Sequence, residues 1–331
     1  SMKRTRTFTI AAAALAAVLT MSSCGGKREA EPAAEGGDGC TAASGQITIA
    51  TGNSTGVYYV LGGGLAQVIS DNSDLKATAS ETGASVQNLQ QLSSGDFDIA
   101  FSLADTAADA VSGDADFKEA EDISALSRIY DNFTHVVVRK DAEIDSVEDF
   151  KGKTISTGSP KSGTEVIANR LIESAGLKDG DVTKQRLDLS KTVDGMKDGT
   201  IDGMVWSGGL PTAGVTDLFT SNGKDVEILD ISDLEGKMKE INPVYEVAEI
   251  PGDTYKGVDT VKTIVTPNVL MVRNDMDEGT VCALTKLLFD KKDDLVKVHA
   301  AAKEINLDTA EPPEPIKLHP GSQKALDELN K

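Results

Sequence analysis

Hydrophobic and polar positions alternate over residues 46–50 and then take up a helical spacing, which predicts a strand followed by a helix. Ile47 and Ile49 alternate with polar neighbours, as in a half-buried strand. Small, flexible residues occupy positions 51–56. An apolar stripe with a spacing of three or four then follows, formed by Val57, Leu61, Leu65 and Val68. The predicted unit is a strand, a small-residue turn and a helix.

The turn at residues 51–56 is suited to holding an anion. It directs several backbone N–H groups and the positive end of a helix dipole towards one place. Ser54 or Thr55 can accept hydrogen bonds from the first N–H groups of the helix. An ordinary turn between a strand and a helix is an equally simple interpretation of the same residues.

The same pattern recurs along the chain and predicts an α/β fold. Further strands are predicted at 75–80, 97–101, 135–139, 154–157 and 201–206. Helices are expected to open at Ser85, Asp105 and Thr164, each after a small-residue turn. The runs at 136–138 and 269–272 are continuously apolar, as expected for strands buried on both faces. Repeated units of this kind predict parallel sheets covered by helices, with ligands outside the carboxyl ends of the strands.

Composition and charge narrow the choice of partners. The 331 residues are enough for one large or two medium domains. The formal net charge is −20, and it becomes −23 if residues 1–23, with Lys3, Arg4 and Arg6, are removed. This field repels nucleic acid and anionic membrane surfaces. Aromatic residues are only 4% of the chain, so no stacking platform for bases or sugars is indicated.

Residues 1–24 resemble a bacterial lipoprotein signal. Basic residues precede an apolar run at 8–21, which is too short to span a bilayer as a helix. The run ends in Met-Ser-Ser-Cys, and in such signals cleavage before the cysteine, here Cys24, leaves its thiol diacylated. Met21 stands where these signals more often carry leucine. A plain secretory signal with an incidental cysteine is the alternative.

Residues 25–45 mix Gly, Ala, Glu and Pro without periodicity, which predicts a flexible linker. Once Cys24 is lipidated, Cys40 and Cys282 are the two remaining cysteines. Outside the cytoplasm an even pair suggests a disulfide. Two free thiols are the alternative, because the sequence does not tell how far apart the two residues lie.

The sequence favours a binding protein over an enzyme. His135, His299 and His319 are isolated, and no HExxH, CxxC or GxSxG motif is present. The segment GNSTG lacks the lysine of a phosphate-binding loop. No metal or cofactor site is predicted. An exported enzyme acting on a small anionic substrate, a ligand-binding sensor and an adhesive surface protein remain as alternatives.

Eight segments resemble, in order, the successive motifs of the TAXI family of solute-binding proteins from TRAP (tripartite ATP-independent periplasmic) transporters. They cover about residues 46–325 and read TGNSTGVYYVLGGGLAQ, TGASVQNL, FSLADTAADAVSG, GKTISTGSPKSGTEVIANRLIESAGL, KDGTIDGMVWSGGLP, IPGDTY, TPNVLMVRNDMDE and PIKLHPGSQ. The resemblance implies a receptor, and the signal at residues 1–24 predicts that it is exported and lipid-anchored to the outer face of the cytoplasmic membrane. It would bind a small organic anion or an amino acid, such as glutamate, glutamine or a dicarboxylate, and deliver it to a TRAP membrane permease.

The resemblance also implies a two-lobed periplasmic-binding-protein fold of type II, with mixed sheets, helices on both faces and a ligand cleft between the lobes. Residues 46–136 and 264–331 would form lobe 1, and residues 137–263 would form lobe 2. One wall of the cleft would be lined by Thr51, Gly52, Gly56, Val57, Tyr58, Ser85 and Asp105. The other wall would be lined by Ser159, Ser162, Thr164, Trp206, Ser207 and Gly208.

Each candidate also has a purely structural interpretation. Tyr58 can be a half-buried helix residue, Asp105 a helix cap and Trp206 a core residue of a strand. Two departures from the family pattern bear on the ligand. Leu103-Ala104 stands where similar proteins often have Gln-Ser, which removes two polar side chains. Lys161 stands where they often have glycine, and it either contacts an anionic ligand or points to solvent.

Overall fold

Strands and helices alternate through most of the chain. A computed structural model describes residues 39–331, so the predicted signal with Cys24 and the linker residues 25–38 lie outside the described residues. The strands are β1 (Gly45–Ala50), β2 (Leu75–Ser80), β3 (Ile99–Leu103), β4 (Ile123–Arg139), β5 (Thr154–Ser156), β6 (Thr183–Gln185), β7 (Gly203–Gly208), β8 (Val226–Ile228), β9 (Glu246–Ile250) and β10 (Val261–Arg273). The helices are α1 (Val57–Asn72), α2 (Ser85–Ser93), α3 (Ala104–Ser112), α4 (Gly163–Ser174), α5 (Leu189–Asp198), α6 (Ala213–Asn222), α7 (Glu235–Ile241), α8 (Glu278–Asp290), α9 (Lys292–Val298) and α10 (Pro320–Leu329).

The strands pair into one continuous mixed sheet. Its order is β2, β1, β3, β10, β4, β7, β5, β6, and β8 and β9 pair with β4 and β10 respectively. The strands at each end of the sheet are parallel. Strand β1 pairs in parallel with β2 and β3, and β5 pairs in parallel with β6 and β7. The central strands β10 and β4 run against their neighbours. The repeated strand-turn-helix pattern of the sequence therefore correctly predicted the parallel groups.

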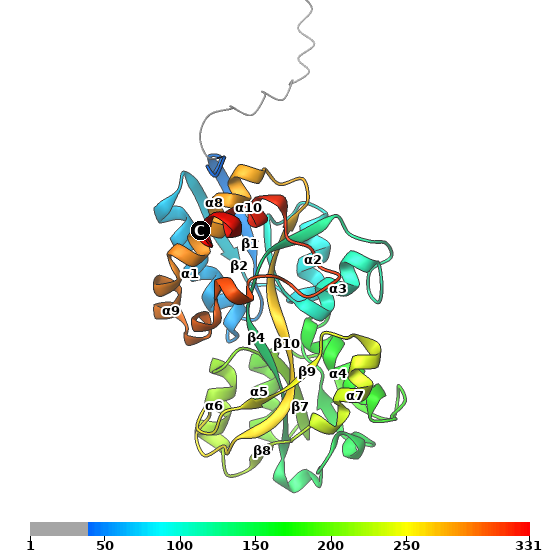
Figure 1. The fold of residues 1–331 in the computed structure, drawn as a ribbon. Helices are drawn as coiled ribbons and strands as arrows, with labels where there is room; N and C mark the ends of the chain where they lie inside the picture. The colour runs from blue at the N-terminus through cyan, green and yellow to red at the C-terminus, as the bar shows by residue number, and fades with distance from the viewer. Residues whose placement is uncertain (1–38) are drawn as a thin grey trace, which may run out of the picture. The chain divides into compact units, whose positions relative to one another are not determined.

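The two central strands are much longer than the sequence indicated. The apolar runs predicted strands at 135–139 and 269–272, whereas β4 has 17 residues and β10 has 13. Figure 1 shows both strands running side by side from the region of α1, α8 and α10 to the region of α5, α6 and α7. Their pairing shifts register on either side of Val269 and Leu270. These strands connect the two groups of helices.

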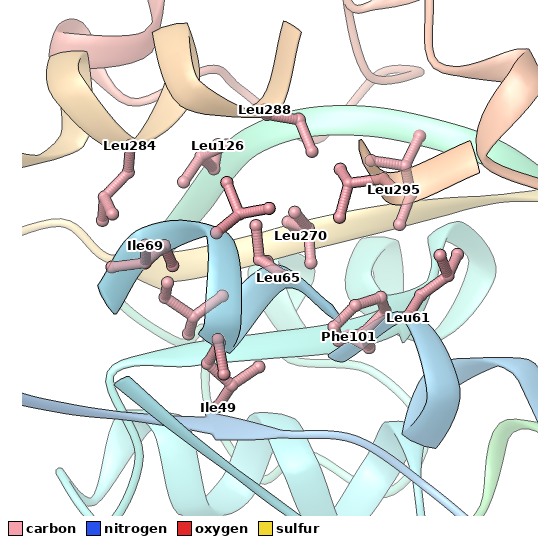
Figure 2. Close-up of a cluster of buried hydrophobic side chains, with 14 of the residues drawn as sticks. Ile49, Leu61, Leu65, Ile69, Phe101, Leu126, Leu270, Leu284, Leu288 and Leu295 are labelled. Atoms are coloured by element: carbon pink, nitrogen blue, oxygen red, sulfur yellow. The ribbon is translucent and has the colours of Figure 1, made fainter. Parts of the chain in front are cut away.

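Buried apolar side chains gather in separate clusters around the sheet. Figure 2 shows one of them, in which Leu61 and Leu65 of α1 pack with Phe101 of β3 and Leu288 of α8. The four positions of the predicted apolar stripe of α1 are all buried. Burying one such side chain contributes about 1.5–3 kcal/mol. A different cluster surrounds Phe150 beside α4. The helices are therefore held mainly by their apolar faces.

Cys40 and Cys282 form a disulfide in the structure. The bond ties the start of the described chain to α8, in the part of the fold that contains α1. Within residues 39–331, no helix combines the length and the apolar composition that a membrane span requires.

Candidate functional site

A cavity lies where the starts of α1, α2 and α4 approach the middle of β4. It encloses about 440 Å3, part of which is open to solvent. Its lining comes from segments far apart in the sequence, namely the turns before the three helices and the strands β4 and β7. Concave sites that combine apolar surface with a few polar groups are typical of sites for small ligands.

The first wall of the cavity is formed by the starts of α1 and α2. It is lined by Gly52, Gly56, Val57, Tyr58 and Ser85. The N-cap of α1 is Gly56, which has no side-chain bond to the helix, so Ser54 and Thr55 do not cap it as the sequence suggested. A Cβ atom at Gly56 would lie 3.2 Å from the indole ring of Trp206. Glycine therefore allows the turn to approach the opposite wall closely.

The second wall is formed by the start of α4 and the end of β7. It is lined by Ser159, Ser162, Thr164, Trp206, Ser207 and Gly208. Helix α4 begins at Gly163, one residue before the predicted Thr164, and its N-cap Ser162 accepts a hydrogen bond from the backbone of Glu165 at 3.1 Å. The hydroxyl of Thr164 accepts the backbone N–H of Ser207 at 3.1 Å. This bond fixes the end of β7 against the first turn of α4.

The ring of Trp206 supplies apolar surface to the second wall. Its Nε1 donates to the hydroxyl of Thr212 at 3.1 Å, so the polar edge of the indole is already bonded. A Cβ atom at Gly56 would approach the six-membered part of the ring, at Cη2 and Cζ2. The side chain therefore offers mainly its ring to the cavity.

A chain of hydrogen bonds joins Tyr58 to the two long strands below the cavity. Asn268 of β10 donates to the backbone oxygen of Tyr130 at 3.1 Å and to Oδ1 of Asn132 at 2.6 Å. The Tyr58 hydroxyl donates to Oδ1 of Asn268 at 2.5 Å. Burial raises the pKa of Tyr58, so this hydroxyl keeps its proton at neutral pH. These hydrogen bonds fix the side chain of Asn132, which lines the cavity, in one orientation.

Direct hydrogen bonds join the two sides of the cavity. Asn53, in the turn before α1, donates to the Ser159 hydroxyl at 3.2 Å. It also accepts the first N–H of α5, from Leu189, at 3.0 Å. Nearby, the backbone N–H of Gly214 donates to the oxygen of Thr55 at 3.3 Å. The structure thus describes a form in which the turn before α1 is bonded to the elements opposite.

Three residues predicted to bind ligand, Thr51, Asp105 and Lys161, do not line the cavity. Thr51 is buried, and its hydroxyl donates to the backbone oxygen of Ser80 at 2.5 Å. Lys161 is exposed, with its ammonium group 3.4 Å from Oε1 of Gln90. The side chain of Lys161 therefore lies outside the cavity, as in the second of the two interpretations of the sequence.

Asp105 belongs to a group of four side chains between α3 and α4 that we call the buried charged cluster: Asp105, Asp109, Arg170 and Tyr245. Arg170 binds Asp109 at 2.7 Å and donates to the Tyr245 hydroxyl at 2.8 Å. Tyr245 in turn donates to Asp105 at 2.5 Å. Helix α3 begins at Ala104, so Asp105 is not its N-cap. Its carboxylate is bound by protein side chains instead.

Burial dominates the electrostatics of the two acids in this cluster. It raises the pKa of the Asp105 carboxyl, although Arg170 and the bond from Tyr245 oppose the shift. It likewise raises the pKa of Asp109 to about 6, again against the opposing effect of Arg170. Arg170 therefore favours the charged form of both carboxylates against the effect of burial.

The structure adds lining residues that the sequence did not predict: Asn53, Ala84, Leu103, Tyr130, Asn132, Gly163 and Gly209. Tyr130 and Asn132 were missed because the predicted strand began only at residue 135. The signal in the sequence was Asn132 itself, a polar residue close to a continuously apolar run. It is 3% exposed, and an asparagine buried this deeply needs hydrogen-bond partners.

The cavity is suited to binding by neutral groups. Apart from the two tyrosines, no residue that lines it carries an ionisable side chain. The three histidines lie elsewhere: His135 binds the hydroxyl of Tyr255 inside the sheet, His299 binds the backbone oxygen of Pro211, and His319 caps α10. The lining hydroxyls therefore have no adjacent base that would turn one of them into a nucleophile.

Comparison with known proteins agrees with a binding fold. A model of the NMT1-like family matches residues 49–329. A binding protein component of an ABC phosphonate transporter from Pseudomonas aeruginosa is 12% identical, with a TM-score of 0.56 and coverage of 87% of this chain and 96% of that chain. PhnD1 from Prochlorococcus marinus in complex with methylphosphonate is 12% identical, with a TM-score of 0.54 and coverage of 86% and 98%. A protein from Bordetella bronchiseptica RB50 is 19% identical, with a TM-score of 0.54 and coverage of 85% and 88%. The predicted periplasmic-binding-protein fold is confirmed.

Proposed function

Because the chain belongs to the NMT1-like family, we propose that it is an extracytoplasmic receptor that binds a small organic anion or an amino acid and delivers it to a membrane transporter. The observation that carries this proposal is the cavity, which is lined from both predicted lobes by hydroxyls, amides and helix starts. Helix N-termini and neutral donors are suited to holding an anionic group. The similar phosphonate-binding proteins are consistent with such a role.

The lobes of this receptor comprise residues 46–136 with 264–331, and residues 137–263. The positions of the buried clusters support this division, because the cluster around Leu65 draws on the first set of residues and the cluster around Phe150 draws almost entirely on the second. The long strands β4 and β10 are then the two crossings between the lobes, and the bonds of Asn53 belong to the closed form. A ligand that touches both walls favours that form over an open one.

Closure can be tested with solution scattering and mass spectrometry. The mass of a small molecule that co-purifies with the protein would first identify a ligand. Micromolar affinity corresponds to about 8 kcal/mol, enough to shift an open–closed balance of a few kcal/mol. Saturation with that ligand should then lower the radius of gyration. Identical scattering curves with and without a bound ligand would contradict the closing cleft.

The transporter partner is proposed to be a TRAP permease, and the receptor a member of the TAXI type. The support is the order of the eight sequence motifs that span about residues 46–325. Proteoliposomes that contain the membrane partner distinguish the alternatives. Uptake driven by an ion gradient without ATP is expected, whereas uptake that requires ATP would assign the receptor to an ABC transporter.

The receptor is further proposed to be exported and anchored to the outer face of the cytoplasmic membrane through a lipid on Cys24. The support is the short apolar run and the small residues before the cysteine. In cells, Cys24→Ser should move the protein from the membrane fraction to the soluble fraction and abolish labelling by a lipid precursor. Labelling equal to that of the unchanged protein would contradict the anchor.

A further inference from the structure

The hydrogen bonds around Asn132 decide which end of its amide faces the cavity. A backbone oxygen can only accept, so the atom of Asn268 that lies 3.1 Å from the Tyr130 oxygen must be its Nδ2. The same Nδ2 lies 2.6 Å from Asn132, whose facing atom must then be Oδ1. The Nδ2 of Asn132 is therefore left on the other side, 3.4 Å from the Ser207 hydroxyl. Asn132 lines the cavity with a donor that has one weak bond.

Two hydroxyls next to this amide also have protons to donate. Thr164 accepts from the backbone of Ser207, and Ser207 accepts from Asn132. Neither hydroxyl has an acceptor for its own proton among residues 39–331. Ser162 differs, because its proton is already donated to the Ser159 oxygen at 2.7 Å. The free donors thus gather on one side of the cavity, at β4, β7 and the start of α4.

Tyr130 provides a further, independent sign of a missing partner. Tyr130 is one of the residues that line the cavity, and it is 2% exposed. Its hydroxyl has no hydrogen-bond partner within the described part of the chain. A buried hydroxyl without a partner is unfavourable, so a ligand group that accepts its proton would be bound more tightly.

The cavity has no matching group for a cation. No carboxylate lines it, and the nearby Asp105 is already bound to Tyr245 and lies next to Arg170. An ammonium group in such a place would lose its water without gaining a charged partner, which is strongly unfavourable.

Resting on the proposed receptor function, we infer that the ligand is a small organic anion without an ammonium group, and that its acidic group binds the donors of Asn132, Thr164 and Ser207. This inference narrows the ligand class, because it rejects the amino acids among the candidates. Tyr130 and the apolar ring of Trp206 contact other parts of the same ligand.

Pairs of acids that differ by one ammonium group test this inference. The probes are propanoate and alanine, succinate and aspartate, glutarate and glutamate, ethanesulfonate and 2-aminoethanesulfonate, and ethylphosphonate and 2-aminoethylphosphonate. Thermal melting identifies the probes that bind, and calorimetry gives their affinities. At least one acid without the ammonium group should bind, and its amino partner should bind at least about tenfold more weakly, as expected for an unpaired charge. An amino partner that binds equally well or better would overturn the inference, as would binding of none of the unsubstituted acids.

Asn132→Asp should remove the preference for the acid with almost no change of shape. The aspartate can still accept the bond from Asn268 while it places a carboxylate among the donors. Affinity for the best acid should fall at least about a hundredfold, and the advantage over its amino partner should disappear. Asn72→Asp makes the same charge change on an exposed residue at the end of α1 and should leave both affinities unchanged. Equal acid binding by Asn132→Asp and the unchanged protein would place the acidic group elsewhere.

Ser207→Ala gives a second measurement in case Asn132→Asp does not fold. It removes one donor, and the Ser207 side chain makes only the weak 3.4 Å bond to Asn132. Acid affinity should fall roughly tenfold to a hundredfold, the range for a bond to a charged group. An unchanged affinity would contradict the donor site.

The failure of this inference can be told apart from the failure of the receptor function. A neutral or cationic solute that binds and lowers the radius of gyration would overturn the inference and leave the receptor function standing. If sugars, polyamines, peptides and all the acids above fail to bind, the receptor function itself is contradicted.

Discussion

The cavity and the buried charged cluster bury polar groups in opposite ways, although helix α4 contributes to both. The cavity has Thr164, at the start of α4, and uses hydroxyls and amides. The cluster has Arg170, further along α4, and uses three charged side chains and a tyrosine. In the cluster the partners of each charge are protein side chains. In the cavity the hydroxyls of Thr164 and Ser207 only accept hydrogen bonds, and within residues 39–331 the Tyr130 hydroxyl has no partner.

This difference shows which charges such a receptor can bury. A charge without a partner is too costly to bury, so the protein buries charges only where it supplies both signs itself. An unpaired neutral donor has a smaller free-energy cost in the ligand-free protein, because only one hydrogen bond is left unmade. The ligand then brings the charge. The predictions below test the two regions against each other.

The largest effect is expected from Arg170→Met, which leaves Asp105 and Asp109 without their cation. The free energy of unfolding at pH 8 should fall by about 3–5 kcal/mol, the usual cost of breaking a buried ion pair. Urea unfolding measures it. Arg186→Met is the matched control, because Arg186 pairs with Glu165 at 2.6 Å on the surface and should cost about 1 kcal/mol or less. Equal losses in the two variants would mean that burial of the cluster has no energetic consequence.

Thr164→Val should act on binding. Removing its hydroxyl should weaken binding of the best acid roughly tenfold to a hundredfold, because a donor to a charged group is lost. Calorimetry measures the change. Thr192→Val removes a hydroxyl that is buried outside the cavity, where it bonds to Ser156, and should leave affinity unchanged. If both variants bind alike, Thr164 does not contact the ligand.

The buried cluster should give stability a pH dependence that the cavity does not share. The pKa of Asp109 is about 6 in the fold and about 4 when unfolded, so between these values the folded state binds more protons. Stability relative to Asp109→Asn should therefore fall by roughly 1–3 kcal/mol as the pH rises from 4 through 6, and become level about one pH unit above 6. Urea unfolding across this range checks it. If the stability of the unchanged protein relative to Asp109→Asn rose with pH instead, burial would not raise the pKa of Asp109.

The smallest effect is expected from Lys161→Ala. Lys161 is exposed, and its ammonium group bonds to Gln90 outside the cavity. The affinity of the protein for the best acid should change less than about twofold at low and at high salt. An exposed charge outside the cavity is screened by salt and water. A large loss that shrinks with added salt would instead bring this cation into the site, and the cavity would no longer be uncharged.

Much of the candidate site was predictable because it is built from local patterns. The small-residue turns before α1 and α4 placed Gly56, Tyr58 and Ser162 at the cavity from spacing and family resemblance alone. The structure differs from the predicted cavity lining where a side chain has more than one possible partner. Asp105 carries the charge expected of a ligand residue, but its partners Arg170 and Tyr245 lie 65 and 140 residues away in the chain. The lobe boundaries stay a prediction.

The sequence by itself determined the α/β class, the strand-turn-helix units and the apolar stripe of α1, because a period of two or three to four residues is a property of neighbouring positions. The tertiary structure alone decided that β4 and β10 extend through polar residues, and that Asn268 turns the amide of Asn132 towards the cavity. It also decided that Asp105 is bound away from the cavity. These features depend on pairs of residues far apart in sequence, and no local pattern records which distant group will satisfy a buried hydrogen bond or charge.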